Sequence, residues 1–349
     1  MALNKRSLLN RVLVGIVIFI IMIGMILLNI FLPNYAQDAG TWRGFVSGRA
    51  INSFLIGALI LLSVIEMRRA LGTERIPNCF SWLLWLYGIG LMPAYVLFGF
   101  VGILFFSLIV FITSVITALV RNRADSLIYI AFMLVYPGLF MATLLYLNRS
   151  ANTHLELTID SATNKMYPYL EADIWYYIND VFIHTFSRQS YLLPLNAIAL
   201  SFVFAVSTFT DMFAYFVGGL FGKHKLCPHI SPNKTVEGAI GGIFGGALGS
   251  FLVYVIFDLT HFFGYGAQFG LTFEGLGLST FNTVFTYVII GLLGSVVTQI
   301  GDLLASMVKR YCGIKDYSRL LGEHGGIIDR FDGIMLNSVF VSFVFMFIL

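Results

Sequence analysis

The chain is poor in charged residues. Only 11% of its 349 residues are Asp, Glu, Lys or Arg, whereas about a quarter is usual in soluble proteins. Hydrophobic residues make up 58% of the chain, and the mean hydropathy is +0.86. This composition is typical of a polytopic membrane protein rather than a soluble enzyme, and we expect no nucleic-acid partner.

Cysteine is also scarce. Cys79, Cys227 and Cys312 are far apart in the sequence. Their spacing fits neither a metal-binding motif nor a disulfide framework. We therefore expect all three to be structural.

Long apolar runs, in contrast, are abundant. Because a helix needs roughly 20 apolar residues to cross a bilayer, we predict an all-α fold with about nine transmembrane helices, over residues 12–32, 45–66, 79–97, 99–120, 127–147, 194–220, 237–257, 283–307 and 327–349. The boundary between the third and fourth runs is open, because Pro93, Gly99 and Gly102 could instead kink one long hairpin. The first run is longer than a signal-peptide core, so we expect it to remain as an anchor.

Basic residues predict the orientation of these helices. With a cytoplasmic N-terminus, only five of the 21 Lys and Arg residues would lie outside, namely Arg43, Arg49, Arg149, Lys165 and Arg188. Such asymmetry is expected of cytoplasmic loops. It places the loops 221–236 and 308–326 on the cytoplasmic side of what we predict to be a bacterial cytoplasmic membrane.

One polar segment interrupts the apolar pattern. Residues 148–190 carry several carboxylates and an aromatic cluster at Trp175, Tyr176 and Tyr177. We favour a solvated extracytoplasmic insert over a binding module, since Trp and Tyr are common at membrane interfaces. The predicted organisation is an N-terminal helical region (1–147), this insert (148–190) and a C-terminal catalytic region (191–349).

The C-terminal region contains ionisable residues within and between its apolar runs, where burying a charge in the membrane is costly. Helical spacing puts Asp302, Ser306 and Lys309 on one face, with Arg310 close to the same stripe. A buried Asp–Lys pair that only neutralises itself is the alternative. We favour a functional site, because one structural pair would not require the charged and glycine-rich residues that follow.

The segment after this helix turns the chain towards the last predicted helix. It begins with Lys315 and Asp316 and ends in His324, Gly325 and Gly326. Glycines allow the backbone to approach a ligand closely, and the free N–H groups of a helix N-terminus favour anions such as phosphate. A single histidine is weak evidence of catalysis.

Two carboxylates follow at the start of the last helix. Asp329 and Asp332 lie three residues apart and therefore share a face. Asp329 and Asp302, on different helices, could converge on Mg²⁺, which prefers one or two carboxylates together with substrate phosphates.

A second polar cluster surrounds the sixth predicted helix and the loop after it. Asp211 lies within the apolar run, and the loop combines basic residues with hydroxyl groups in a pattern that suits a polyphosphate. Its candidate binding residues are Lys223, Lys225, Ser231, Lys234, Thr235 and Glu237. The next helix repeats Gly238, Gly242 and Gly246, and also Gly241, Gly245 and Gly249, spacings that allow transmembrane helices to pack closely.

These motifs together resemble a known family. The spacing of Ser306, Lys309, Arg310, Lys315, Asp316, Ser318, Leu321, Gly322, His324, Gly325, Gly326, Asp329, Arg330 and Asp332 is similar to the signature of the phosphatidate cytidylyltransferases, or CDP-diacylglycerol synthases. The upstream cluster at Asp211 and 221–238 also resembles that family. The close resemblance covers about residues 201–349.

The resemblance implies an integral membrane enzyme that condenses CTP with phosphatidic acid, giving CDP-diacylglycerol and pyrophosphate. It implies a Mg²⁺ site at Asp302 and Asp329, with a monovalent cation such as K⁺ beside it, and it makes Lys309, Arg310 and Lys315 phosphate ligands. Asp316 and His324 complete the catalytic candidates. The remaining candidates would bind substrate, namely Asp211, Lys223, Lys225, Ser231, Lys234, Thr235, Glu237, Ser306, Gly325, Gly326, Arg330 and Asp332.

Two other functions remain open. A CTP-dependent lipid-alcohol kinase would also combine intramembrane polar residues with CTP, and a secondary transporter would place carboxylates within the membrane. A transporter is expected to show two similar halves, whereas the candidate residues lie in the C-terminal half. Membrane lipid is an expected partner in each case, and a homodimer is one open assembly state.

Overall fold

The computed structural model describes residues 5–31, 48–149, 158–159, 166–167, 195–259, 279–322 and 325–347. Most of these residues are helical, which confirms the predicted all-α membrane fold. The helices are α1 (Lys5–Phe31), α2 (Gly48–Arg75), α3 (Ser81–Arg121), α4 (Ser126–Met133), α5 (Phe140–Arg149), α7 (Leu195–Phe221), α8 (Val236–Tyr254), α9 (Thr280–Tyr311) and α10 (Ile328–Phe347).

Shorter elements connect or extend these helices. A 3-10 turn (Asn78–Phe80) precedes α3, and π-helical turns join α4 to α5 (Leu134–Leu139) and extend α8 (Val255–Leu259). Two antiparallel pairs of short strands are present, β1 (Thr158–Ile159) with β2 (Met166–Tyr167), and β3 (Lys225–Cys227) with β4 (Ser231–Thr235). The first pair belongs to the predicted insert, most of which lies outside the described residues. None of the three cysteines forms a disulfide.

Six helical segments within the described ranges are long and apolar enough to cross a membrane. Each predicted span overlaps a helix, although α2 continues nine residues past the predicted end of its span at residue 66. The count of nine spans stays a prediction, because apolar length alone does not place a helix across a bilayer.

The longest helical segment is a hairpin rather than one rod. Gly99 has φ 63° and ψ −153°, a backbone conformation that side-chain-bearing residues avoid. The Tyr87 and Ser107 hydroxyls are 3.2 Å apart, and the Tyr87 and Phe106 rings stack with centroids 6.2 Å apart. In a continuous helix, Tyr87 and Ser107 would be about 30 Å apart. The two halves of α3 therefore pack antiparallel, as the two predicted spans on either side of Gly99 require.

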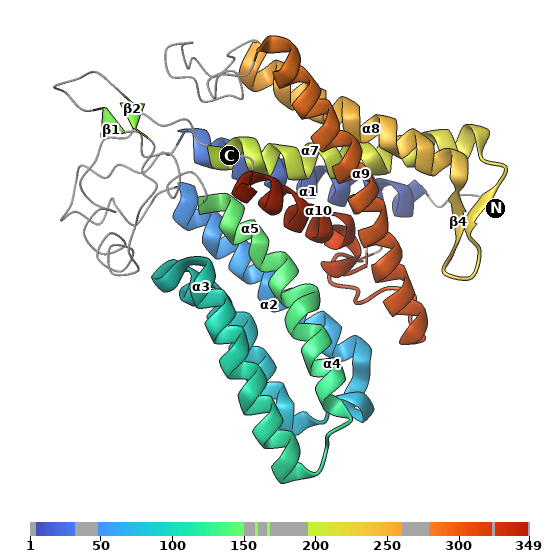
Figure 1. The fold of residues 1–349 in the computed structure, drawn as a ribbon. Coiled ribbons are helices and arrows are strands. Elements are labelled where there is room, and N and C mark those ends of the chain that lie inside the picture. The colour runs from blue at the N-terminus through green and yellow to red at the C-terminus, as the bar shows by residue number, and fades with distance from the viewer. Residues whose placement is uncertain are drawn as a thin grey trace.

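Glycines on α8 allow it to pack closely against two neighbours. A Cβ at Gly245 would lie 2.5 Å from the Phe209 carbonyl oxygen on α7, and one at Gly246 would lie 2.9 Å from the Gly291 carbonyl oxygen on α9. Figure 1 shows α8 lying beside α7 with α9 crossing in front. The predicted close approach of helices is confirmed, and it brings α7, α8 and α9 into one bundle.

Asparagines join the N-terminal helices to this bundle. Asn52 on α2 donates to Asn29 on α1 (3.0 Å), and Asn29 donates to Asn148 on α5 (3.0 Å). Asn196 on α7 donates to the Asn148 carbonyl oxygen (3.0 Å). All four are buried. Buried amide pairs of this kind link transmembrane helices, because the alternative is an unsatisfied polar group in an apolar surrounding.

The segments predicted to be cytoplasmic lie together at one end of the molecule. Arg75 at the end of α2 donates to the Tyr311 carbonyl oxygen (3.4 Å), and its guanidinium lies 4.8 Å from the Tyr311 ring centroid. The Tyr129 and Tyr311 hydroxyls are 2.8 Å apart. Arg310 donates through Nε to the Ile230 carbonyl oxygen between β3 and β4 (3.1 Å). These contacts join the ends of α2 and α9, the start of α4 and the β3–β4 hairpin.

Candidate active site

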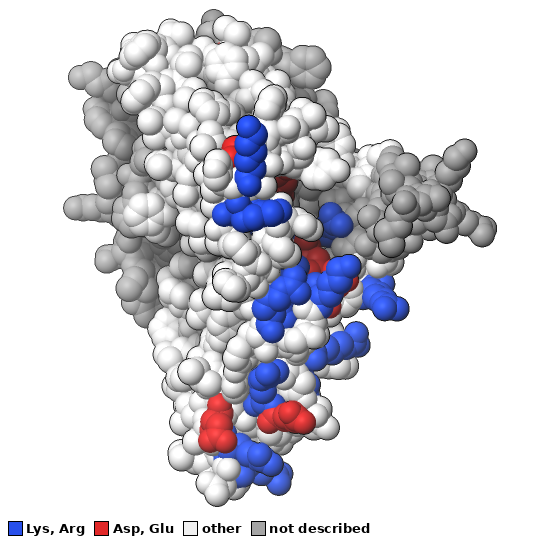
Figure 2. Space-filling view, turned by 90° about the vertical axis from the view of Figure 1, so that its right-hand side faces the viewer, with Lys and Arg blue, Asp and Glu red and all other residues white. Residues whose placement is uncertain are grey.

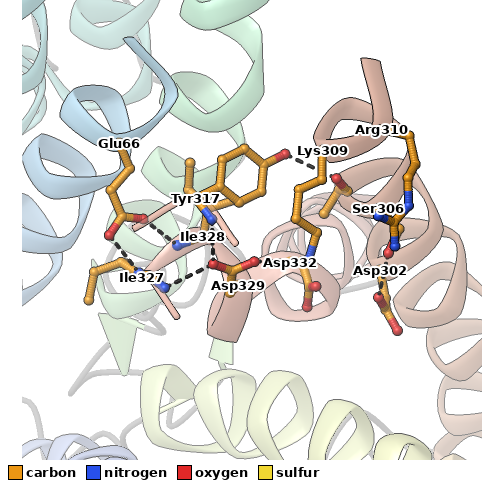
Figure 3. Close-up of polar contacts among 12 residues, drawn as sticks. Glu66, Asp302, Ser306, Lys309, Arg310, Tyr317, Ile327, Ile328, Asp329 and Asp332 are labelled. Atoms are coloured by element: carbon orange, nitrogen blue, oxygen red, sulfur yellow. Dashed lines mark hydrogen bonds and ion pairs between the residues drawn. The ribbon is translucent and has the colours of Figure 1, made fainter. Parts of the chain in front are cut away.

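The predicted polar face of α9 is present, but its residues are paired differently from the simplest expectation. Ser306 donates through Oγ to Asp302 Oδ1, one turn away (3.4 Å). Lys309 does not neutralise Asp302. Its Nζ donates to Asp329 Oδ1 on α10 (2.9 Å), so the ion pair connects α9 to α10, a pairing that the spacing along α9 did not indicate (Figure 3).

Asp329 is held by donors on both of its carboxylate oxygens. Oδ2 accepts from the backbone N–H groups of Tyr317 (2.8 Å) and Gly326 (2.9 Å), and Oδ1 accepts from Lys309. The Asp329 side chain is only 7% exposed. Three donors compensate a buried carboxylate for the loss of its hydration, so Asp329 organises the loop between α9 and α10.

At Gly325 and Gly326 of that loop, a side chain would collide with carboxylates of the protein itself. Gly325 has φ +78°, and a Cβ there would lie 2.7 Å from Asp329 Oδ2. A Cβ at Gly326 would lie 2.5 Å from Glu66 Oε2. This backbone therefore lies close to Asp329 and Glu66, whereas its predicted approach to a bound phosphate stays a prediction.

Asp302 pairs with a lysine from the other motif segment. Lys234 on β4 forms an ion pair with Asp302 Oδ2, and the two side chains are 25% and 29% exposed. Both remain partly accessible, unlike Asp329. This pair brings together residues about seventy positions apart, one from each of the two polar clusters.

The segment 221–236 differs from the expected loop, because much of it folds as the β3–β4 hairpin. Thr235 accepts from the Gly238 N–H (3.1 Å) and thereby caps α8. Glu237 accepts from the Lys223 N–H (3.1 Å) and lies 2.6 Å from His224 Nδ1. Thr235 and Glu237 thus hold the hairpin to α8, a role that helix-capping preferences could have indicated.

Two further carboxylates lie close to Asp302. Asp211 on α7 is exposed and lies within range of the charges of Asp302, Lys234 and Arg330. Asp332 on α10 is half-buried and lies within range of Asp302 and Asp211. Figure 3 shows the Asp332 side chain between those of Asp329 and Asp302. Acidic side chains from α7, α9 and α10 therefore surround one region.

Most of the exposed candidates are basic. Among the described residues, those predicted to bind or act on substrate and found exposed are Asp211, Lys223, Lys225, Arg310, Lys315, Asp316 and Arg330, while Ser231 is half-buried. Figure 2 shows Lys and Arg side chains gathered along one face of the molecule. His324 lies outside the described residues.

Two residues of the site were missed by the sequence analysis. Tyr317 is buried, donates through its hydroxyl to the Ala305 carbonyl oxygen (3.1 Å), and has its ring centroid 5.8 Å from Lys309 Nζ. Burial raises the pKa of the Tyr317 hydroxyl well above its usual range, so the tyrosine is a neutral hydrogen-bond donor. The other is Glu66 on α2. The sequence could have indicated Glu66, because a carboxylate within an apolar helix is often functional.

Comparisons with known proteins show the family of the chain. A sequence model of the family described as "Cytidylyltransferase family" matches residues 4–348. Similar curated proteins include the phosphatidate cytidylyltransferases of Staphylococcus epidermidis, 40% identical over 134 residues (38% of this chain and 44% of the relative), and of Brucella abortus, 40% identical over 142 residues (41% and 44%). The matches span less than half the length of these relatives. Because the family match covers nearly the whole chain, the protein belongs to the cytidylyltransferase family.

Proposed function

We propose that the protein transfers the cytidylyl group of CTP to phosphatidic acid, giving CDP-diacylglycerol and pyrophosphate. Family membership and the names of the similar proteins support this activity. The structural observation that carries it is the ion pair between Lys234 and Asp302, which brings the β3–β4 hairpin to the charged face of α9. Basic and acidic groups from both motif segments thereby surround one region, as a charged nucleotide substrate requires.

The reaction requires little covalent chemistry from the protein. An oxygen of the phosphatidate phosphate attacks the α-phosphorus of CTP, a new P–O–P bond forms, and the bond to the leaving pyrophosphate breaks. The protein contributes by holding both substrates in line and by stabilising charge on the transferred and leaving groups. Lys309, Arg310 and Lys315 are the proposed phosphate ligands, and Lys223, Lys225 and Arg330 are further exposed basic residues of the two motif segments.

Lys309 and Lys234 each form an ion pair with a carboxylate. A substrate phosphate would compete with Asp329 and Asp302 for these two ammonium groups. We expect Lys234 to exchange partners more readily, since its side chain is 25% exposed and that of Lys309 is 16% exposed. Ser306 can keep Asp302 oriented during such an exchange.

The donor set suits a hard divalent cation such as Mg²⁺. Asp302 is partly exposed, and Asp211 and Asp332 bring two more carboxylates within range of its charge. No three His, Cys, Asp or Glu residues of the described ranges form a ready-made metal site, and Mg²⁺ commonly uses one or two carboxylates together with substrate phosphates. A bound Mg²⁺ would supply positive charge at the phosphates.

The predicted metal pair of Asp302 and Asp329 remains part of the proposal. To bind the cation, Asp302 would have to release Lys234, and Asp329 would have to release Lys309. A monovalent cation such as K⁺ beside Mg²⁺ stays a prediction, as does assembly as a homodimer.

The protein is an integral membrane protein, given its apolar helices. We place the active site on the cytoplasmic side, where CTP is available. The asymmetry of basic residues supports this orientation. The contacts that join the ends of α2 and α9 to the hairpin also support it, since they require all these segments to lie on the same side.

The test is a transfer assay with the purified protein, Mg²⁺, phosphatidic acid and CTP labelled at different phosphates. We expect the α-phosphate and cytidine to appear in the lipid, and chelation of the metal to stop the transfer. A lipid kinase would instead transfer only the γ-phosphate, and a transporter would transfer neither. Label from the γ-phosphate in lipid, or no transfer from α-labelled CTP by folded protein, would refute the proposal.

A further inference from the structure

Glu66 is a buried carboxylate far in sequence from every group that it binds. It lies on α2 and is 3% exposed. Oε1 accepts from the Ser318 hydroxyl (2.6 Å) and the Ile327 N–H (2.9 Å), and Oε2 accepts from the Ile328 N–H (2.9 Å). All three donors belong to the loop between α9 and α10 or to the first residue of α10, more than 250 positions away.

These contacts make Glu66 a helix cap supplied by another helix. The first N–H groups of a helix have no partner within it, and a negative charge near them is favourable. α10 begins at Ile328, so Glu66 accepts from the start of α10. Three charge-assisted hydrogen bonds compensate the burial of the carboxylate.

Glu66 and Asp329 hold the same loop from two sides. Asp329 accepts from the Tyr317 and Gly326 N–H groups, and Glu66 accepts from the neighbouring Ser318 and Ile327. Figure 3 shows the loop backbone between the two carboxylates, with Lys309 on the far side of Asp329. The position of Asp329 relative to Lys309 therefore depends on a residue of the N-terminal helices.

We propose that Glu66 is a positioning residue of the active site. By fixing the loop and the start of α10, it holds Asp329 where it meets Lys309, and it couples α2 to the transfer reaction. The kinetic part of this inference rests on the proposed function, whereas the structural part does not. The hydrogen bonds of Glu66 in the described part of the chain go to the loop and the start of α10, so its effect is exerted through Asp329 and Lys309.

The test combines kinetics with hydrogen–deuterium exchange of the purified protein. Glu66→Gln keeps the shape of the side chain, but it removes the charge and turns an amide N–H₂ towards a backbone donor. We expect faster exchange in peptides covering 317–332 and a kcat lower by about tenfold to a hundredfold, the scale of losing charge-assisted hydrogen bonds. The KM for CTP should change less than kcat, because the residue acts on groups that stabilise the transition state.

Three further single variants and one double variant make the result specific. Glu74→Gln removes an exposed carboxylate at the end of α2, beyond the kink at Gly72, and should leave exchange and kcat unchanged. Ser318→Ala removes one of the three donors and should give a smaller change in the same direction, while Glu66→Asp keeps the charge and should recover part of the activity. The double variant with Ser318→Ala should lose less than the two single effects added together, since both single changes weaken the same contact.

The outcomes separate this inference from the proposed function. A wild-type protein without cytidylyl transfer would refute the proposed function. Increased exchange in Glu66→Gln would still support the inference that Glu66 fixes the loop before α10. Wild-type exchange and kcat in folded Glu66→Gln would overturn the inference. If that variant does not fold, wild-type exchange and kcat in Ser318→Ala would overturn it.

Discussion

Lys309 on α9 and Asp329 on α10 form a largely buried ion pair, with Nζ 2.9 Å from Oδ1. The Asp329 carboxylate also accepts from two backbone N–H groups of the intervening loop. The pair therefore links the helix that carries Asp302 to the loop that Glu66 holds from the other side. A change in either partner should affect both stability and catalysis.

Replacement of Lys309 by Met should show this dual role. The variant leaves a buried carboxylate without its cation, and breaking one side of a buried pair typically costs about 3–5 kcal/mol. We expect a lower melting temperature in detergent and a loss of activity. The double variant with Asp329→Asn should be less unstable than the two single effects added together, because no unpaired charge remains. Additive losses of stability would show that the pair is not coupled.

Neutralising Asp302 should instead affect activity more than stability. Asp302 is partly exposed, and Lys234 can turn to solvent when its partner is lost. We expect Asp302→Asn to lower activity by at least about a hundredfold, the scale for a group that stabilises transition-state charge, with little loss of folded protein. Asp125→Asn, at an exposed carboxylate before α4, is the matched control. Near-normal activity at saturating Mg²⁺ would remove Asp302 from the metal site.

Asp329→Asn should lose activity to a similar extent if the predicted metal pair is correct. This variant differs from Asp302→Asn because it also weakens the loop, so its melting temperature should fall further. Activity and folded protein should be measured on the same preparations. An Asp329→Asn protein that is folded and active would show that the carboxylate is needed for neither role.

The orientation can be tested with single cysteines in a background that lacks the native three. Cysteines at Asn233 and Arg319 should react with impermeant thiol reagents only from the cytoplasmic side. A cysteine at Asp160, in the predicted insert and outside the described residues, should react only from the other side. Labelling of Asn233 and Asp160 from the same side would contradict the predicted span count.

Close helix packing can be tested at one glycine of α8. A Cβ at Gly246 would lie 2.8 Å from Thr210 Oγ1 and 2.9 Å from the Gly291 carbonyl oxygen. We expect Gly246→Ala to destabilise the bundle by about 1–3 kcal/mol, as overpacking typically does. Gly219→Ala is the matched control, because a Cβ there meets nothing within 4 Å. Equal melting temperatures of the two variants would contradict the packing argument.

The sequence determined the membrane fold and the motif residues of this protein. Apolar length predicts helices because the bilayer sets their minimum length, and the glycine repeats of α8 predict close approach because only small residues permit it. Charged groups that are costly in a membrane indicated the functional region, from Asp211 to Asp332. Each of these inferences depends on local pattern alone.

Tertiary structure decided which of these charged groups meet. Spacing along α9 places Asp302 and Lys309 on one face, but their partners, Lys234 and Asp329, come from other elements. Likewise, the residues around Glu66 on α2 do not indicate that its carboxylate binds the loop before α10. Partner choice follows from how helices cross and where loops return, and these long-range contacts leave no periodic signal in a single sequence.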